Sequence, residues 1–193
     1  MLSFEWSVGA DRVFVNSGTS VYGLGEERLR QRKTASHNTV VVDDCDSSEV
    51  WSGFRVARRA SPSRPVLSCT GDDVLLSCSH NGYQRLPGRV THNRSWFSEH
   101  EKLTVKDTLL GKYKGARAHF YLHPDVEIKD NKDACICILL PSKTQVDLEF
   151  SGGDVMLIDS TWHPEFGVSA PNKCIVLGFT CNKAVMTATV SCR

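Results

Sequence analysis

Residues 30–44, RQRKTASHNTVVVDD, place three kinds of chemistry side by side: a basic run, a His–Asn pair and an apolar run that ends in two acids. Arginine side chains bind carboxylates and sulfates through paired hydrogen bonds. An imidazole beside fixed cations has its protonated form disfavoured, which keeps His37 available as a base. The run TVVV is typical of a buried strand and would hold this histidine on a rigid support. The segment therefore combines groups that could bind an anionic ligand and accept a proton from it.

Two arginine-rich stretches would each present a row of guanidinium groups if they were extended. Because strand side chains alternate between two faces, Arg28, Arg30 and Arg32 would share one face. In the stretch RVARR, Arg55 and Arg59 would share a face in the same way. The alternative is a solvated sheet face on which the arginines pair with nearby acids, namely Glu26, Glu27, Asp46 and Glu49.

The other histidines and the cysteines lack the spacing of common metal sites. The 7 histidines form no HxH or HExxH motif, and the 8 cysteines, from Cys45 to Cys192, form no CxxC pair. Cys135 and Cys137 would face the same side of a strand, where they could form a metal edge or a redox pair. The alternative is that both are small apolar residues of a core.

Composition excludes several classes of function. The net charge of +1 gives no overall field that would recruit nucleic acid, so polyanion binding must come from local clusters. No run of apolar residues is long enough to cross a membrane, and MLSFEWSVGADR does not resemble a signal peptide. We expect a periplasmic or secreted protein if an export signal lies upstream of Met1, and a cytoplasmic one otherwise. The length, 193 residues, favours one domain that spans residues 1–193.

The secondary-structure signal is many short β segments separated by turn residues. Only residues 26–33 suggest a helix, and that stretch is short and poorly capped. The pattern predicts an all-β protein, an antiparallel β-sandwich or jelly-roll-like stack. The expected strands are 3–8, 12–17, 38–44, 53–60, 65–69, 73–79, 100–109, 116–124, 133–141, 145–152, 154–160, 174–180 and 184–191.

Several motifs resemble one known family. RQRKTASHNTVVVDD continues into SEVWSGFRVARRA, and SHNGYQRLPGRVTHNRSW, HFYLHPDV and WHPEFG follow. Together they are similar to the C-terminal β-sheet domain of the heparinase II/III-like polysaccharide lyases. The resemblance covers nearly the whole chain, and its HNTVVVD and SEVWSGFRVARRA pieces are the most specific.

The resemblance implies a chemistry as well as a fold. These enzymes cleave uronate-containing acidic polysaccharides by β-elimination, which needs a base, a group that neutralises the carboxylate and an acid for the leaving oxygen. It implies that His37 is catalytic. It also implies substrate contacts, which we expect from Arg30, Arg32, Asn38, His80, Tyr83 and Arg94.

The resemblance also implies partners and raises a question of metal binding. Relatives carry an N-terminal helical toroid, and the sugar chain lies between the toroid and the β domain. Without that half, we expect this chain alone to have little or no lyase activity. Some relatives hold zinc through an HxH pair, but Thr39 stands at the second position of that pair here. No metal site is therefore expected, although His92 with Asp44 or Asp46 could still bind a structural zinc, and a buried histidine is the alternative.

Two other functions remain possible from the sequence. The domain could bind glycans without chemistry, in which case binding would be sensitive to salt and independent of His37. It could also be a structural module, with an exposed apolar patch near Trp51 or Phe54 where a partner docks.

Overall fold

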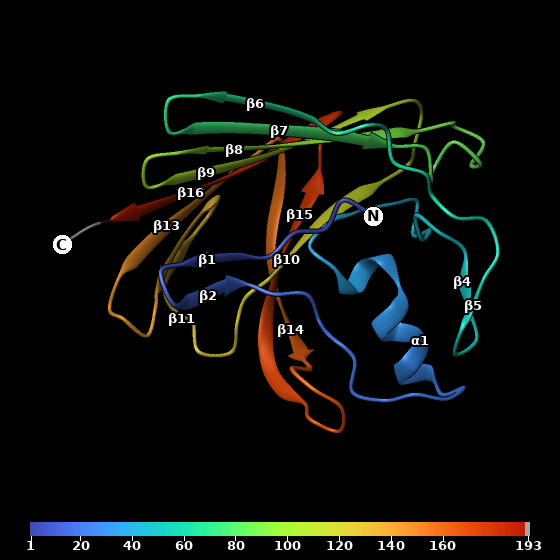
Figure 1. Cartoon of the computed structure of the whole chain (residues 1–193), viewed down its shortest axis with the longest axis horizontal. Helices are drawn as coiled ribbons and strands as arrows, with labels where there is room; N and C mark the ends of the chain where they lie inside the picture. The colour runs from blue at the N-terminus through green and yellow to red at the C-terminus, as the bar shows by residue number, and fades with distance from the viewer. Residues whose placement is uncertain (192–193) are drawn as a thin grey trace.

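The protein is a two-layer β-sandwich. A computed structural model describes residues 1–191. Its strands form an eight-stranded sheet, a four-stranded sheet and two small two-stranded sheets, and all strand pairs within them are antiparallel. Figure 1 shows the long strands of the larger sheet across the top of the molecule, with β10, β14 and β15 running below them. The predicted all-β sandwich is therefore confirmed.

The larger sheet has the order β11-β12-β13-β16-β9-β8-β7-β6, and the smaller one β14-β15-β10-β3. The first contains β6 (Val66–Thr70), β7 (Asp73–His80), β8 (Thr91–Glu99), β9 (Lys102–Leu110), β11 (Glu127–Lys132), β12 (Cys135–Leu139), β13 (Gln145–Ser151) and β16 (Lys183–Ser191). The second contains β3 (Val40–Val42), β10 (Ala116–Tyr121), β14 (Gly153–Trp162) and β15 (Ala170–Phe179). The small pairs are β1 (Trp6–Val8) with β2 (Asp11–Phe14) and β4 (Val50–Trp51) with β5 (Arg55–Val56).

The core lies between the two sheets. In β13, Val146, Leu148 and Phe150 are buried while the residues between them are partly or fully exposed, which is the alternation expected of a strand with one solvated face. Phe120 on β10 and Leu177 on β15 belong to the same buried cluster. Burial of these side chains is the main force that holds the two layers together.

Residues 26–32 form a helix, so the expectation of an extended arginine row was wrong. Helix α1 (Glu26–Arg32) begins after Gly25, which supplies no side-chain cap, and the 3-10 helix η1 (Thr34–Ser36) follows it. On a helix, Arg28 and Arg32 are one turn apart and share a face, whereas Arg30 points elsewhere. The second expected row is also absent, because β5 is only two residues long.

The loop before α1 makes a close backbone contact with the segment after β14. Gly18 pairs with His163 in a parallel bridge and has a φ of +76°. A Cβ atom at residue 18 would lie 1.9 Å from the carbonyl oxygen of His163. Only glycine fits this position, and the contact fixes the backbone that carries His163.

Candidate functional site

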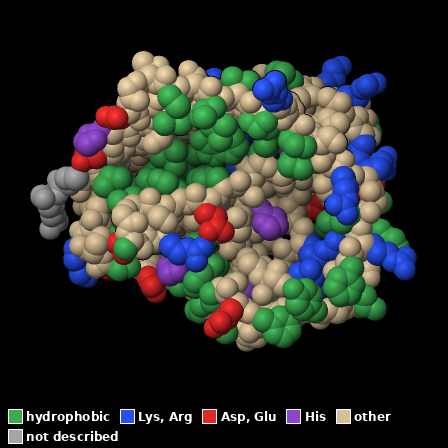
Figure 2. Space-filling model, viewed as in Figure 1, with side chains coloured by type: hydrophobic (Ala, Val, Ile, Leu, Met, Phe, Trp, Pro, Cys, Tyr) green, Lys and Arg blue, Asp and Glu red, His purple; other side chains and the backbone are tan. Residues whose placement is uncertain are grey.

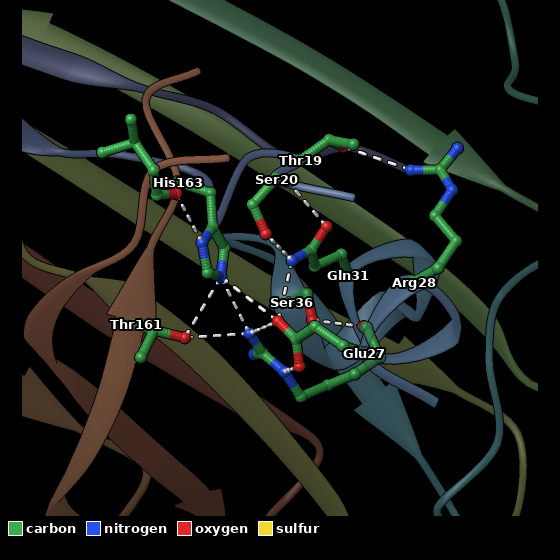
Figure 3. Close-up of polar contacts among 10 residues, drawn as sticks. Thr19, Ser20, Glu27, Arg28, Gln31, Ser36, Thr161 and His163 are labelled. Atoms are coloured by element: carbon green, nitrogen blue, oxygen red, sulfur yellow. Dashed lines mark hydrogen bonds and ion pairs between the residues drawn. The ribbon is translucent and has the colours of Figure 1, made fainter. Parts of the chain in front are cut away.

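A polar cluster, shown in Figure 3, attaches helix α1 to the four-stranded sheet. The Arg30 guanidinium donates to both carboxylate oxygens of Glu27, at 2.8 and 2.6 Å, and to Thr161 Oγ1 at 2.8 Å. It also lies 3.0 Å from His163 Nε2. Because His163 Nδ1 lies 3.1 Å from the carbonyl oxygen of Val168, which can only accept, the neutral ring carries its proton on Nδ1 and accepts from Arg30. These hydrogen bonds lower the pKa of Glu27 to about 2, so Glu27 compensates the charge of Arg30.

The charges of Arg28 and Arg32 are not compensated in this way. Arg32 donates to the carbonyl oxygens of Ser52 at 2.7 Å and Arg55 at 3.1 Å, and Arg28 donates to Gly53 O and Thr19 Oγ1 at 3.3 Å. Within residues 1–191, neither arginine has an acidic partner. Both therefore keep a full positive charge beside the loop between β4 and β5, which favours anion binding there.

Exposed aromatic rings lie beside these arginines. Tyr22 stacks on Phe54 at 6.4 Å and on Phe166 at 5.4 Å between ring centroids. Arg28 lies over the ring of Tyr22 at 5.1 Å, and Arg55 over that of Trp51 at 4.8 Å. We call Arg28, Arg32, Tyr22, Phe54 and Phe166 the cationic–aromatic surface. Figure 2 shows Lys or Arg and hydrophobic side chains together at the lower right, over α1 and the β4–β5 hairpin of Figure 1.

His37 lies in the connection between η1 and β3, and not on the strand itself. Its backbone N–H donates to Thr34 O at 3.2 Å, and its side chain is partly exposed. Among the described residues, the imidazole has no hydrogen-bond or ion-pair partner. Burial, followed by the N-terminal ammonium, lowers the pKa of His37 to about 4. The ring is neutral at pH 7, as a base requires, but the expected cause, a neighbouring arginine row, was wrong.

Asn38 fixes the backbone next to His37 through buried hydrogen bonds. Its side chain is fully buried, with Nδ2 donating to Phe4 O at 2.8 Å and Oδ1 accepting from Tyr121 N at 2.6 Å. Its own N–H donates to Asn16 Oδ1, and its carbonyl oxygen accepts from Arg94. Every polar group of Asn38 is therefore used inside the protein, which fixes the position of the adjacent histidine.

His80 and His92 form a directed chain of hydrogen bonds that ends at Asp107. Gly82 N–H donates to His80 Nδ1 at 3.1 Å, so the His80 proton is on Nε2. Nε2 then donates to His92 Nδ1 at 3.1 Å, and His92 Nε2 donates to Asp107 Oδ1 at 2.6 Å. One direction of donation satisfies every group with both rings neutral. Burial first, and then the neighbouring His92, lower the pKa of His80 to about 3.

Arg94 and Tyr83 complete this interior network. Arg94 binds Asp107 with two hydrogen bonds, at 2.7 and 2.8 Å, and donates to Leu2 O at 2.8 Å. Tyr83 Oη donates to Val40 O at 2.6 Å, and burial raises the pKa of Tyr83. Four of the residues expected to contact the sugar are at most 2% exposed, so they cannot touch it directly in this structure: Asn38, His80, Tyr83 and Arg94. Any effect they have on a bound sugar would come from the residues that they position.

The residues proposed for a zinc site do not fit one. Both ring nitrogens of His92 are occupied, by His80 and by Asp107. Asp44 pairs with Arg117, and Asp46 Oδ1 accepts from Thr34 N at 2.6 Å. Among the described residues, no group of three or more His, Cys, Asp or Glu side chains could hold a metal ion. The cysteines in that range are free thiols, and Cys192 lies outside the described residues.

A cavity of about 770 Å³ has no histidine in its lining. Its walls include Asp43, Asp44, Lys112, Lys114 and Arg117. Both carboxylates of this wall are engaged: Asp43 Oδ1 accepts from the backbone N–H groups of Lys114 and Gly115, and Asp44 pairs with Arg117. We therefore take as candidate functional residues His37, whose imidazole is free of partners among the described residues, and Arg28 and Arg32, whose charge is uncompensated.

Buried neutral histidines predict loss of stability in mild acid. Burial lowers the pKa of His80 to about 3 and that of His119 to about 4, from 6.5. Below pH 6.5 the unfolded chain therefore binds protons that the folded protein does not, so stability is complete above that pH and falls as the pH drops toward 4. For each of these histidines, the free energy of unfolding of the protein should fall by about 2 kcal/mol by about pH 5.

Urea unfolding across this pH range checks that prediction. Glu27 and Glu49, whose pKa values are lowered to about 2, reduce the stability only below their usual value of 4.5. The range from about pH 7 to 5 therefore reports the buried histidines together with the N-terminal ammonium of Met1, whose pKa burial also lowers. His119→Phe should flatten the dependence, whereas His100→Ala, at a side chain that is 91% exposed, should not. A free energy of unfolding that is constant from about pH 7 to 5 would contradict the assignment.

Comparison with known proteins identifies the family. The model of the family "Heparinase II/III-like, C-terminal" matches residues 1–188, so the chain belongs to this family. The expected resemblance is confirmed. No helix among the described residues is long and apolar enough to cross a membrane. No curated protein sequence matches the chain.

Solved structures of lyases share the fold. "Heparinase III-BT4657 gene product" in its lysine-methylated form superposes with a TM-score of 0.79 at 17% sequence identity over 99% of this chain. Heparan sulfate lyase HepC from Pedobacter heparinus gives 0.74 at 15% identity over 97%. The chain spans about 30% of the length of each of these two proteins.

The sequence did not predict the residues that hold α1 in place. The sequence named Glu27 only as a possible ion-pair partner and gave no role to His163. The structure joins them to Arg30, and Glu27 Oε1 also accepts from Gln31 at 2.7 Å. The WHPEFG motif was the one signal near His163, and it carried no information about its distant partner on α1.

Proposed function

We propose that this chain is the β domain of a polysaccharide lyase that cleaves uronate-containing acidic polysaccharides by β-elimination. The observation that carries the proposal is His37: a partly exposed, neutral imidazole without a partner among the described residues, held by a rigid buried network. Membership in the heparinase II/III-like family gives this histidine its chemical context.

In this reaction, His37 would remove or relay the proton next to the uronate carboxylate. Breaking that C–H bond leaves a negative charge on the enolate form of the carboxylate, and the 4-linked oxygen then departs with a proton, which leaves a C=C bond. A neutral ring with a low pKa is ready to accept a proton at neutral pH. Arg32 and Arg28 carry uncompensated charge and would bind the acidic groups of the sugar chain. Arg30 is already bound to Glu27, so it would hold helix α1 in place and would bind the sugar's acidic groups less than Arg28 and Arg32 do.

A helical N-terminal domain would supply the remaining catalytic groups and cover the exposed rings. Tyr22, Phe54 and Phe166 are 66, 65 and 64% exposed, and Leu24 is 78% exposed. Large apolar side chains gathered on one surface mark a place where another molecule or domain docks. The two lyases with the same fold have chains about three times as long as this one, which leaves room for such a domain.

The test uses the protein as encoded, with any sequence that precedes residue 1. It is incubated separately with heparan sulfate, chondroitin sulfate and alginate, and unsaturated uronate is followed by its ultraviolet absorbance. We expect product from at least one polymer and none from residues 1–193 alone. Retention on immobilised polysaccharide without unsaturated product would instead identify a glycan-binding module. Absence of both retention and product would leave a structural domain.

Arg32 offers a sharper test of sugar binding at the cationic–aromatic surface. Arg32→Ala should raise KM about 5- to 30-fold, because a charge-assisted hydrogen bond to the sugar is worth about 1–2 kcal/mol. Arg58→Ala is the matched control: Arg58 lies near the same hairpin, but its charge is compensated by Glu49 at 2.6 Å. Thermal melting of both variants checks that the β4–β5 loop is intact. An equal KM for the two variants would remove Arg32 from the binding surface.

A further inference from the structure

The two edges of the eight-stranded sheet differ in charge. At one edge, β11 carries Glu127, Lys129, Asp130 and Lys132, which form two ion pairs along the strand. Charged side chains of this kind prevent edge strands from pairing with other chains. At the opposite edge, β6 (Val66–Thr70) has no charged residue, and all five of its residues are exposed. Figure 1 shows β6 at the upper rim of the sheet.

The apolar inner face of the sheet continues to this uncharged edge. Leu67 pairs with Leu76, Leu76 with Trp96, and Trp96 with Val105 across neighbouring strands. Exposure rises along this row from 1% at Val105 to 63% at Leu67. The core row therefore ends in a leucine that no other layer of the described fold covers.

The β6–β7 hairpin determines which backbone groups point outward. Thr70 pairs with Asp73 across a two-residue turn in which Gly71 has a φ of +60°, as in a type II′ turn. The residues that close such a turn exchange hydrogen bonds, so Thr70, Ser68 and Val66 bond inward to β7. The N–H and C=O groups of Leu67 and Cys69 consequently face the open edge.

We infer that β6 is a dimerisation edge that pairs antiparallel with β6 of a second copy of this chain, about a two-fold axis at Ser68. In this register Leu67 lies opposite Cys69 of the partner, which joins the outward backbone groups of both strands. The same register places Arg64 opposite Asp72 of the partner. Within residues 1–191, neither residue has an ion pair inside its own chain. A second copy therefore supplies both the missing hydrogen bonds and a complementary charge.

A charge-swap experiment tests this register in reducing buffer. Sedimentation of residues 1–193 between about 1 and 200 μM should show a monomer–dimer equilibrium. Arg64→Asp and Asp72→Arg, each alone, place like charges opposite each other and should weaken the dimer at least 10-fold, whereas the double variant should restore it. Cys69→Pro removes an outward N–H without touching the hairpin bonds and should abolish the dimer.

Other outcomes would overturn the inference. A monomer at every concentration, or a double variant that dimerises no better than the single ones, excludes this pairing. A longer form of the protein that stays monomeric because another segment covers β6 also excludes it. Circular dichroism of each variant confirms that the sheet is intact. The outcome does not depend on lyase activity, because the β6 edge contains none of the candidate site residues.

Discussion

Asp107→Asn should destabilise the folded protein by about 3–5 kcal/mol, because it removes one partner of a buried ion pair and leaves the other unpaired. The side chains of Arg94 and Asp107 are 0 and 2% exposed, and Asp107 also accepts from His92. The substituted amide replaces one acceptor oxygen with an NH2 donor, which would face the N–H group of Arg94 that now binds Asp107 Oδ2. For a chain of this size the melting temperature should fall by roughly 6–20 °C, measured by thermal and urea unfolding near pH 7.

Two further variants separate this mechanism from a general loss of an aspartate. Asp154→Asn is the matched control, because Asp154 is exposed on β14 and has no hydrogen bond or ion pair among the described residues. It should change stability by less than about 0.5 kcal/mol. Replacing the whole pair with Arg94→Met and Asp107→Leu should recover much of the loss, since no buried charge is then left alone. If Asp107→Asn melts like the control, the pair contributes little to stability.

The network around Arg94 also explains why β8 was not among the strands expected from periodicity. The inner positions of β8 include His92 and Arg94, so the strand lacks the apolar alternation that marks a half-buried strand. β13, whose inner positions are all apolar, was predicted correctly. β11 was missed for a different reason: it is an edge strand with mostly exposed polar residues, and only its pairing with β12 defines it.

Helix α1 shows the opposite limit of local sequence reasoning. The stretch is seven residues long and has no side-chain cap, so it would be marginal as an isolated helix. Contacts distant in sequence stabilise it instead: Gln31 bonds to Ser20, and Arg30 to Thr161 and His163. These contacts also decide which arginines keep a free charge. The local sequence could therefore identify the arginines, but it could not tell which of them hold the helix in place and which keep a free charge.

The resemblance to the family located His37, whereas the structure supplies the physical reason that it could act. All seven histidines lie among the described residues, and six have other environments. His80, His92 and His163 use both ring nitrogens internally, and His119 is buried. His123 bonds to Asp125, and His100 lies near Glu101 on the surface. None of these distinctions can be read from sequence spacing, because each depends on a partner that the fold brings close.

His37→Ala should lower kcat by about 10²- to 10⁴-fold in the protein as encoded, which is the range typical for loss of a general base. KM and the melting temperature should change little, because the imidazole has no hydrogen-bond partner among the described residues and the backbone is held through Asn38. Unsaturated uronate released from the preferred polysaccharide provides the rate. His100→Ala, at a 91% exposed side chain, is the matched control and should retain full activity.

The pH dependence distinguishes catalysis by His37 from a structural effect. Burial is the main cause of the lowered pKa of His37 and does not depend on a free N-terminus. The base should therefore stay unprotonated as the pH falls from about 7 to 5, and kcat/KM should begin to fall only well below pH 6.5. Unfolding in mild acid acts in the same range, so initial rates are measured within seconds of dilution from about pH 7. A base with an ordinary histidine pKa would instead lose about half its activity by about pH 6.5. That result, or a His37→Ala variant with undiminished kcat, would assign the proton transfer to another residue.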